Sequence, residues 1–139
     1  HLGHPLQQRL DYPTPRCELG VMLKDLASSM IDVSDGLAQD LGHILNASGV
    51  GAKINLNQLP IQSALRQLSD NEQWKYALAG GDDYELCFTI TMQNYAKLLQ
   101  LKPNVTTTII GQVTQKSGIV FEKDGLDHPL QLQGYQHFA

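Results

Sequence analysis

The stretch from Met30 to Leu37 constrains the fold most, because it joins a strand-like run to a helical pattern through a polar turn. Residues 30–33 are largely apolar, as at the end of a buried strand, and residues 37–47 repeat leucine and isoleucine at helical spacing. A glycine stop follows at 48–51, and residues 52–56 alternate as in a strand. The pattern predicts a strand, a helix and a second strand in succession.

Periodicity along the rest of the chain predicts an α+β fold, in which a mixed sheet packs with helices. Strict alternation of apolar side chains makes residues 84–90 the clearest strand. Ser69 is expected to cap a helix through Trp74–Leu78, and Thr91 or Asn94 to cap the next helix. The other expected elements are helices over 18–26, from Pro60 and over 95–101, strands over 106–113 and 118–121, and a tight turn at Asp124 and Gly125.

Length and composition bound the class of protein. The 139 residues suffice for one domain that buries about two thirds of its unfolded surface. We expect residues 1–16, which contain three prolines, to form an extended connector and residues 17–139 to form a single domain. A net charge of −4 without a basic run argues against a nucleic-acid partner, and no apolar run approaches the ~18–20 residues of a membrane span. Cys17 and Cys87 are expected to be free thiols in a reducing compartment, which predicts a cytoplasmic location.

Two carboxylates and a hydroxyl lie at the first turn, as Asp32, Ser34 and Asp35. At a strand-to-helix turn the first N–H groups of the helix are unpaired and the helix dipole is positive, which suits a phosphate. Carboxylates three residues apart suit Mg²⁺, which takes oxygen ligands and often binds together with phosphate oxygens. The simpler alternative is that Ser34 or Asp35 only caps the helix, and this stretch alone does not separate the two interpretations.

A second candidate site lies at residues 80–86, where two glycines precede Asp82, Asp83 and a strand. Glycines let the backbone come close to a ligand. Adjacent carboxylates repel each other, so they call for a cation, for solvent or for a basic partner. A solvated turn is the simpler alternative for this motif taken alone.

Other polar side chains are less suggestive of a site. Asp40 and His43 lie three residues apart on the flank of the helix, where we expect them to be solvated rather than bound to metal. His137 has no matching ligand partner in the sequence, and Cys87 lies in a strand interior as a small packed residue.

Taken in order, these motifs resemble those of the thiamine-monophosphate kinase family. The motifs that carry the resemblance are residues 29–37, 40–41, 48–52, 59–60, 80–86, 110–111 and 134–138. The resemblance covers nearly the whole chain but only the C-terminal half of that enzyme. It implies membership of the superfamily of aminoimidazole ribonucleotide synthetase, whose members are two-domain dimers that bind ATP with Mg²⁺.

The resemblance implies transfer of the γ-phosphoryl group of ATP to thiamine monophosphate, giving thiamine diphosphate. It implies that Asp32 and Asp35 are Mg²⁺ ligands, that Ser34 contacts the ATP phosphates, and that Asp83 and Tyr135 meet the thiamine phosphate. Asp82 stands where the family often has Glu, so no role is assigned to it. The N-terminal ATP and Mg²⁺ domain is expected to be absent from this chain, and the isolated chain is therefore expected to be inactive.

Two rival functions remain open. One is another ATP-dependent synthetase of the same superfamily, such as a selenophosphate synthetase, against which residues 80–86 and 135–138 argue. The other is a non-catalytic module that binds metal or nucleotide. A substrate panel separates the first rival from the kinase, and the start of the reading frame separates the second.

Overall fold

The computed structural model describes residues 17–61, 63–80, 85–103 and 105–132, in which helices and strands alternate up to residue 114 and two further strands follow. The helices are α2 (Cys17–Leu23), α3 (Leu37–Ser48), α4 (Asp70–Ala79) and α5 (Met92–Gln100), with short 3-10 turns η1 (Leu56–Gln58) and η2 (Ser63–Leu65). The strands are β1 (Ala27–Val33), β2 (Gly51–Asn55), β3 (Glu85–Ile90), β4 (Gly111–Thr114), β5 (Gly118–Lys123) and β6 (Leu126–Asp127). None of the helices in these ranges is long and apolar enough to cross a membrane.

The strands form two separate sheets. In the smaller sheet β1 pairs antiparallel with β3, and the larger sheet has the order β4-β2-β5-β6. In the larger sheet β2 and β5 are parallel and the other pairs are antiparallel, so the predicted α+β fold with a mixed sheet is confirmed. The predicted succession of strand, helix and strand is also present, but α3 carries the chain from one sheet to the other.

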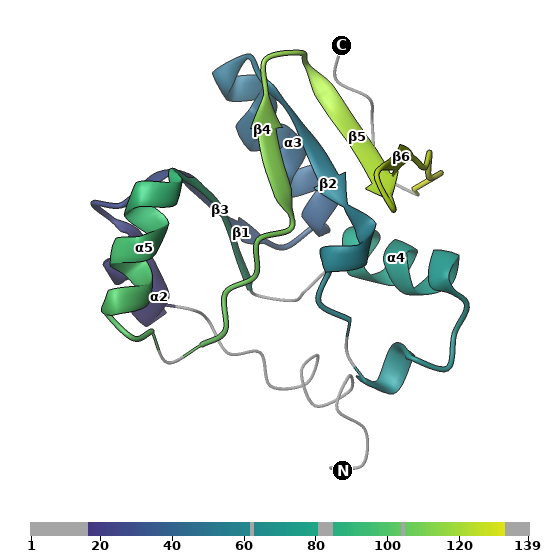
Figure 1. Cartoon of the computed structure of the whole chain (residues 1–139), viewed down its shortest axis with the longest axis horizontal. Coiled ribbons are helices and arrows are strands. Elements are labelled where there is room, and N and C mark those ends of the chain that lie inside the picture. The colour runs from purple at the N-terminus through teal and green to yellow at the C-terminus, as the bar shows by residue number, and fades with distance from the viewer. Residues whose placement is uncertain (1–16, 62, 81–84, 104, 133–139) are drawn as a thin grey trace.

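The small sheet lies between two apolar clusters, with α2 and α5 on one side and α3 on the other (Figure 1). Toward α2 and α5 it presents Leu86, Phe88 and Ile90, which pack against a cluster that includes the fully buried Leu23 and Leu98. Toward α3 it presents residues of the main core, which also includes α4 and the large sheet. The alternation predicted over 84–90 is therefore confirmed for β3, because each face of this strand has its own apolar partner, while Tyr84 lies outside the described residues.

The main core is built around α3. Its buried face carries Ala38, Leu41 and Leu45, which pack in one cluster with residues of β2, β5 and α4. Full burial of a leucine contributes about 1.5–3 kcal/mol, so this face anchors the helix firmly. The loop that precedes α3 is thus attached to a rigid element.

Two predicted segments are shorter than expected. The helix predicted over 18–26 ends at Leu23, where Leu26 N–H bonds the Leu23 carbonyl at 3.0 Å and the chain turns into β1. The helix predicted from Pro60 is reduced to the turn η2. The side-chain amide of the buried Gln73, in α4, donates to the Leu68 carbonyl at 2.8 Å. This carbonyl therefore has a partner without the backbone hydrogen bond that a longer helix would provide.

The strand predicted over 106–113 was also wrong in extent, because only β4 pairs with β2. Before β4, the hydroxyl groups of Tyr95 and Thr107 lie 2.8 Å apart, and the Ile110 carbonyl accepts from Asn55 N–H at 2.8 Å. This segment has β-branched residues but no neighbouring strand beside most of its length.

The predicted caps are confirmed. Ser69 Oγ accepts from Glu72 N–H at 3.3 Å at the start of α4, and Thr91 Oγ1 accepts from Asn94 N–H at 3.1 Å at the start of α5. The predicted tight turn also forms, with positive φ at Asp124 and Gly125.

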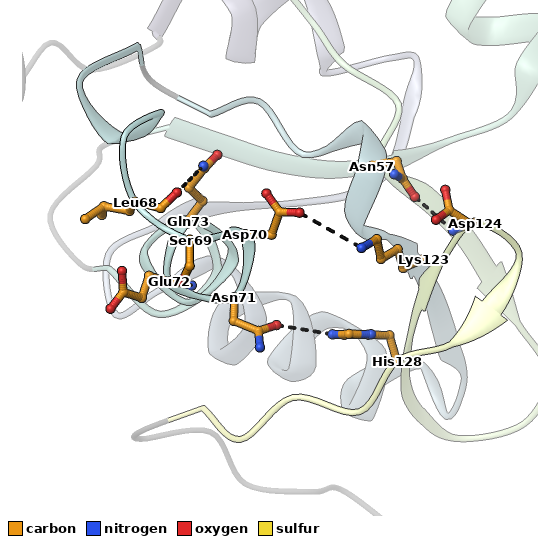
Figure 2. A network of polar contacts seen from close by, with 10 residues as sticks. All are labelled: Asn57, Leu68, Ser69, Asp70, Asn71, Glu72, Gln73, Lys123, Asp124 and His128. Carbon is orange, nitrogen blue, oxygen red and sulfur yellow. Dashed lines mark hydrogen bonds and ion pairs between the residues drawn. The ribbon is translucent and has the colours of Figure 1, made fainter.

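Polar contacts join the first turn of α4 to the strands β5 and β6 (Figure 2). Lys123 Nζ lies 3.9 Å from Asp70 Oδ2 and 5.5 Å from the centre of the Trp74 ring. His128 Nε2 lies 3.2 Å from Asn71 Oδ1, and its ring meets Trp74 edge-on at 5.2 Å. These contacts fix α4 against the large sheet, and so fix where the far end of α4 lies.

Candidate functional site

Asp32, Ser34 and Asp35 lie together and exposed where β1 ends and α3 begins. Asp32 is the penultimate residue of β1, and Ser34 and Asp35 belong to the three-residue loop that leads to α3. Within the described ranges, no ion pair involves the carboxylate of Asp32 or of Asp35. Both carboxylates are therefore available to a ligand from solvent.

Asp40, in the first turn of α3, holds the loop through hydrogen bonds to the loop backbone. Asp40 is 3% exposed, and its Oδ2 accepts hydrogen bonds from the backbone N–H of Ser34 at 2.7 Å and of Asp35 at 3.0 Å. The expectation that Asp40 is solvated was wrong, because its carboxylate is buried. The two backbone N–H donors replace the hydrogen bonds that water would otherwise make to it. His43, by contrast, is exposed as expected.

Neither Ser34 nor Asp35 caps α3. The N-cap is Gly36, which has φ 120° and ψ 145° and makes no side-chain capping bond. The capping alternative is therefore wrong, and the polar side chains of the loop need another reason to be there. Asp40 occupies the N–H groups of Ser34 and Asp35 in the loop, whereas the phosphate interpretation concerns the first N–H groups of the helix itself and stays a prediction.

Two contacts far apart in sequence place the described residues that flank 81–84 beside the first turn. In the antiparallel pair, the last residue of β1, Val33, lies opposite the first residue of β3, Glu85. On the other side, a Cβ atom on Gly36 would come within 3.1 Å of the Cα of Ala79, at the end of α4. The described residues on both sides of 81–84 thus lie beside the Asp32–Gly36 turn. Residues 81–84 themselves, with Asp82 and Asp83, lie outside the described residues, as do Tyr135 and His137.

The donor set at the turn fits a hard cation. Two exposed carboxylates provide the oxygen ligands that Mg²⁺ prefers. No group of three or more His, Cys, Asp or Glu side chains in the described part of the chain is arranged to hold a metal ion. Asp32 and Asp35 would therefore need further oxygen ligands, such as water, phosphate or residues outside this part, which is the usual mode for Mg²⁺.

Cys87, in β3, packs in the main core and is a free thiol. Burial, followed by the negative charge of Asp40, raises the pKa of Cys87 from 9.0 to about 11. The expectation of a small packed residue is confirmed, and such a protonated thiol is a poor nucleophile.

Asp40 is the residue that sequence reasoning missed. Its spacing contained a signal: Asp40 lies three residues after Leu37 and four before Ile44, in line with the apolar stripe of the helix. A carboxylate on the buried face of a helix requires hydrogen-bond donors nearby, and the preceding loop supplies them.

Residues 14–124 match the family described as AIR synthase related protein, C-terminal domain. The chain belongs to this family. Thiamine-monophosphate kinase of Salmonella typhimurium is 44% identical over 141 residues, covering 99% of this chain and 43% of the relative. The crystal structure of thiamine-monophosphate kinase from Stenotrophomonas maltophilia superposes with a TM-score of 0.78 at 41% identity, over 88% of this chain and 39% of that one.

A second similar structure is that of AaThiL complexed with AMPPCP and TMP. It has a TM-score of 0.72 at 29% identity and covers 95% of this chain and 40% of that one. These likenesses confirm the resemblance to thiamine-monophosphate kinase that the motifs indicated. The chain spans about two fifths of the length of these relatives.

Proposed function

We propose that this chain is the C-terminal domain of a thiamine-phosphate kinase, which transfers the γ-phosphoryl group of ATP to thiamine monophosphate to give thiamine diphosphate. The observation that carries the proposal is the exposed pair of Asp32, near the end of β1, and Asp35, on the loop that Asp40 holds in place. The relatives named thiamine-monophosphate kinase support it, and so does the solved complex with AMPPCP and TMP.

In this proposal the residues of the turn bind and orient phosphates. Asp32 and Asp35 hold Mg²⁺, and the hydroxyl of Ser34 contacts the phosphates of ATP, since its N–H is already bonded to Asp40. Asp83 and Tyr135, outside the described residues, meet the thiamine phosphate. A bound Mg²⁺ supplies neutralisation of the phosphate charge, and in-line phosphoryl transfer asks little covalent chemistry of the protein.

The proposal includes a second domain and a second subunit. The relatives are more than twice as long as this chain, so we place ATP and Mg²⁺ between this domain and an N-terminal domain of the same enzyme. The complete enzyme is proposed to be a cytoplasmic homodimer, and this chain alone is proposed to be inactive.

The test is ATP-dependent formation of thiamine diphosphate, with and without Mg²⁺. It compares the 139-residue chain with the complete product of the gene that carries it. We expect Mg²⁺-dependent activity in the complete protein only, and loss of at least about 100-fold for Asp32→Asn and for Asp35→Asn, because each removes a metal ligand. Asp25→Asn removes another exposed carboxylate, outside the turn, and is the matched control.

Three results would contradict the proposal. Full activity of Asp32→Asn would remove this carboxylate from the metal site. Absence of activity on thiamine monophosphate, with activity on the substrates of another synthetase of the superfamily, would assign the chain to that enzyme instead. Absence of all activity would favour a non-catalytic binding module.

A further inference from the structure

The buried carboxylate of Asp40 bonds the loop in an unusual way, because one oxygen serves two successive backbone N–H groups. Asp40 Oδ2 lies 2.7 Å from Ser34 N and 3.0 Å from Asp35 N. The shorter distance is typical of a charge-assisted hydrogen bond, and the longer one is an ordinary N–H···O distance. The main chain of Asp40 adds a third tie, since its N–H donates to the Gly36 carbonyl at 3.0 Å.

These bonds restrict the direction of the side chains on the loop. Two neighbouring N–H groups that converge on one oxygen fix the planes of two successive peptide groups. Ser34 and Asp35 are exposed while Asp40, which accepts from their N–H groups, is buried. Asp40 can impose this geometry because it belongs to α3, whose buried face is packed into the main core.

We propose that Asp40 is the positioning residue of the cation site, and that it keeps Asp35 at the distance from Asp32 at which both carboxylates can bind one ion. The inference rests on the proposed function of Asp32 and Asp35 as metal ligands. Asp40 itself is buried beneath the loop and does not bind the ion. It acts through the loop backbone, as outer partners of metal ligands commonly do.

Position and charge can be separated by two substitutions. Asp40→Asn removes the charge but keeps an oxygen that can accept both N–H groups. Asp40→Glu keeps the charge but lengthens the side chain by one methylene. Because Asp40 is only 3% exposed, there is no room for the longer side chain to put its oxygen in the same place. If position matters, the Asn variant binds the cation well and the Glu variant binds it poorly; if only charge matters, the order is reversed.

The test uses the ¹⁵N-labelled complete protein that contains this chain, together with Mn²⁺, whose paramagnetism broadens the NMR signals of nearby amides even when binding is weak. We expect Mn²⁺ to broaden the amides of residues 34–36 selectively. Asp40→Asn is expected to need at most about 3-fold more Mn²⁺ for the same effect, and Asp40→Glu at least about 10-fold more. Faster hydrogen exchange at the Ser34 and Asp35 amides of the Glu variant, with the Leu45 amide unchanged, would show that the loop moved while the core did not.

Equal Mn²⁺ affinity of the Glu variant and the original protein would overturn the positioning role, as would a loss of about 10-fold or more in the Asn variant. The Asn result decides the question even if the Glu variant does not fold. Asp32→Ala serves as a separate control for the proposed function. If Mn²⁺ broadens no loop amide, or broadens them equally in Asp32→Ala, the metal site itself is wrong and the role of Asp40 at it falls as well.

Discussion

Gly36 faces Ala79 so closely that a methyl group on Gly36 would come within 3.1 Å of the Ala79 Cα. This contact joins the start of α3 to the end of α4, and so joins the Asp32–Gly36 turn to the residues that precede 81–84. It depends on glycine for a second reason, because φ 120° and ψ 145° are strongly unfavourable for any residue with a Cβ atom.

We therefore expect Gly36→Ala to lower the free energy of unfolding by about 2 kcal/mol or more. Gly49→Ala is the matched control, since Gly49 also has positive φ but would meet no atom within 4 Å, and it should cost only about 1 kcal/mol. Urea unfolding measures both. An equal cost for the two variants would show that the contact with Ala79 is not tight.

Asp32→Asn and Asp35→Asn should leave stability nearly unchanged, within about 0.5 kcal/mol, because both carboxylates are exposed and form no ion pair with described residues. Asp40→Ala should instead cost about 2 kcal/mol or more, since it leaves two backbone N–H groups without their acceptor. Thermal and urea unfolding of the three variants test this. A large loss of stability in Asp32→Asn would indicate a structural rather than a ligand-binding role.

Cys87 predicts a loss of stability at high pH. Its pKa is raised from 9.0 to about 11 in the folded chain, so the folded state keeps its proton while the unfolded state loses it. Below pH 9 the Cys87 thiol is protonated in both states and costs no stability. As the pH rises toward 11, the free energy of unfolding declines by up to about 3 kcal/mol. Between pH 8 and 11 the free energy of unfolding should therefore fall more steeply for the Cys17→Ser chain than for the same chain that also carries Cys87→Ala. Parallel curves would mean that the Cys87 thiol is less buried than the structure shows.

Lys123→Gln should weaken the attachment of α4 to the β5–β6 strands by about 0.5–1 kcal/mol, because it removes the charge over Trp74 and beside Asp70. The effect should shrink in 1 M salt, which screens exposed charges. Lys116→Gln, in an exposed turn, is the control and should change stability by less. If both variants behave alike at low salt, the contacts of Lys123 do not stabilise the fold.

The sequence determined the features that depend on near neighbours. Ser69 and Thr91 cap their helices because each side chain reaches an N–H only three residues ahead. The alternation of β3 was visible because side chains in a strand point to opposite faces in turn, whatever lies against them. The motifs that resemble those of the kinase family could also be recognised from the sequence, because each is a short run of neighbouring residues.

Only the tertiary structure decided what depends on distant segments. It assigned β1 and β2 to different sheets and reduced the strand predicted over 106–113 to β4, because strand length depends on a neighbour to pair with. It also buried Asp40 under the loop and placed Gly36 against Ala79. Burial of a carboxylate is tolerable only where donors converge on it, and that convergence exists only once the chain has folded.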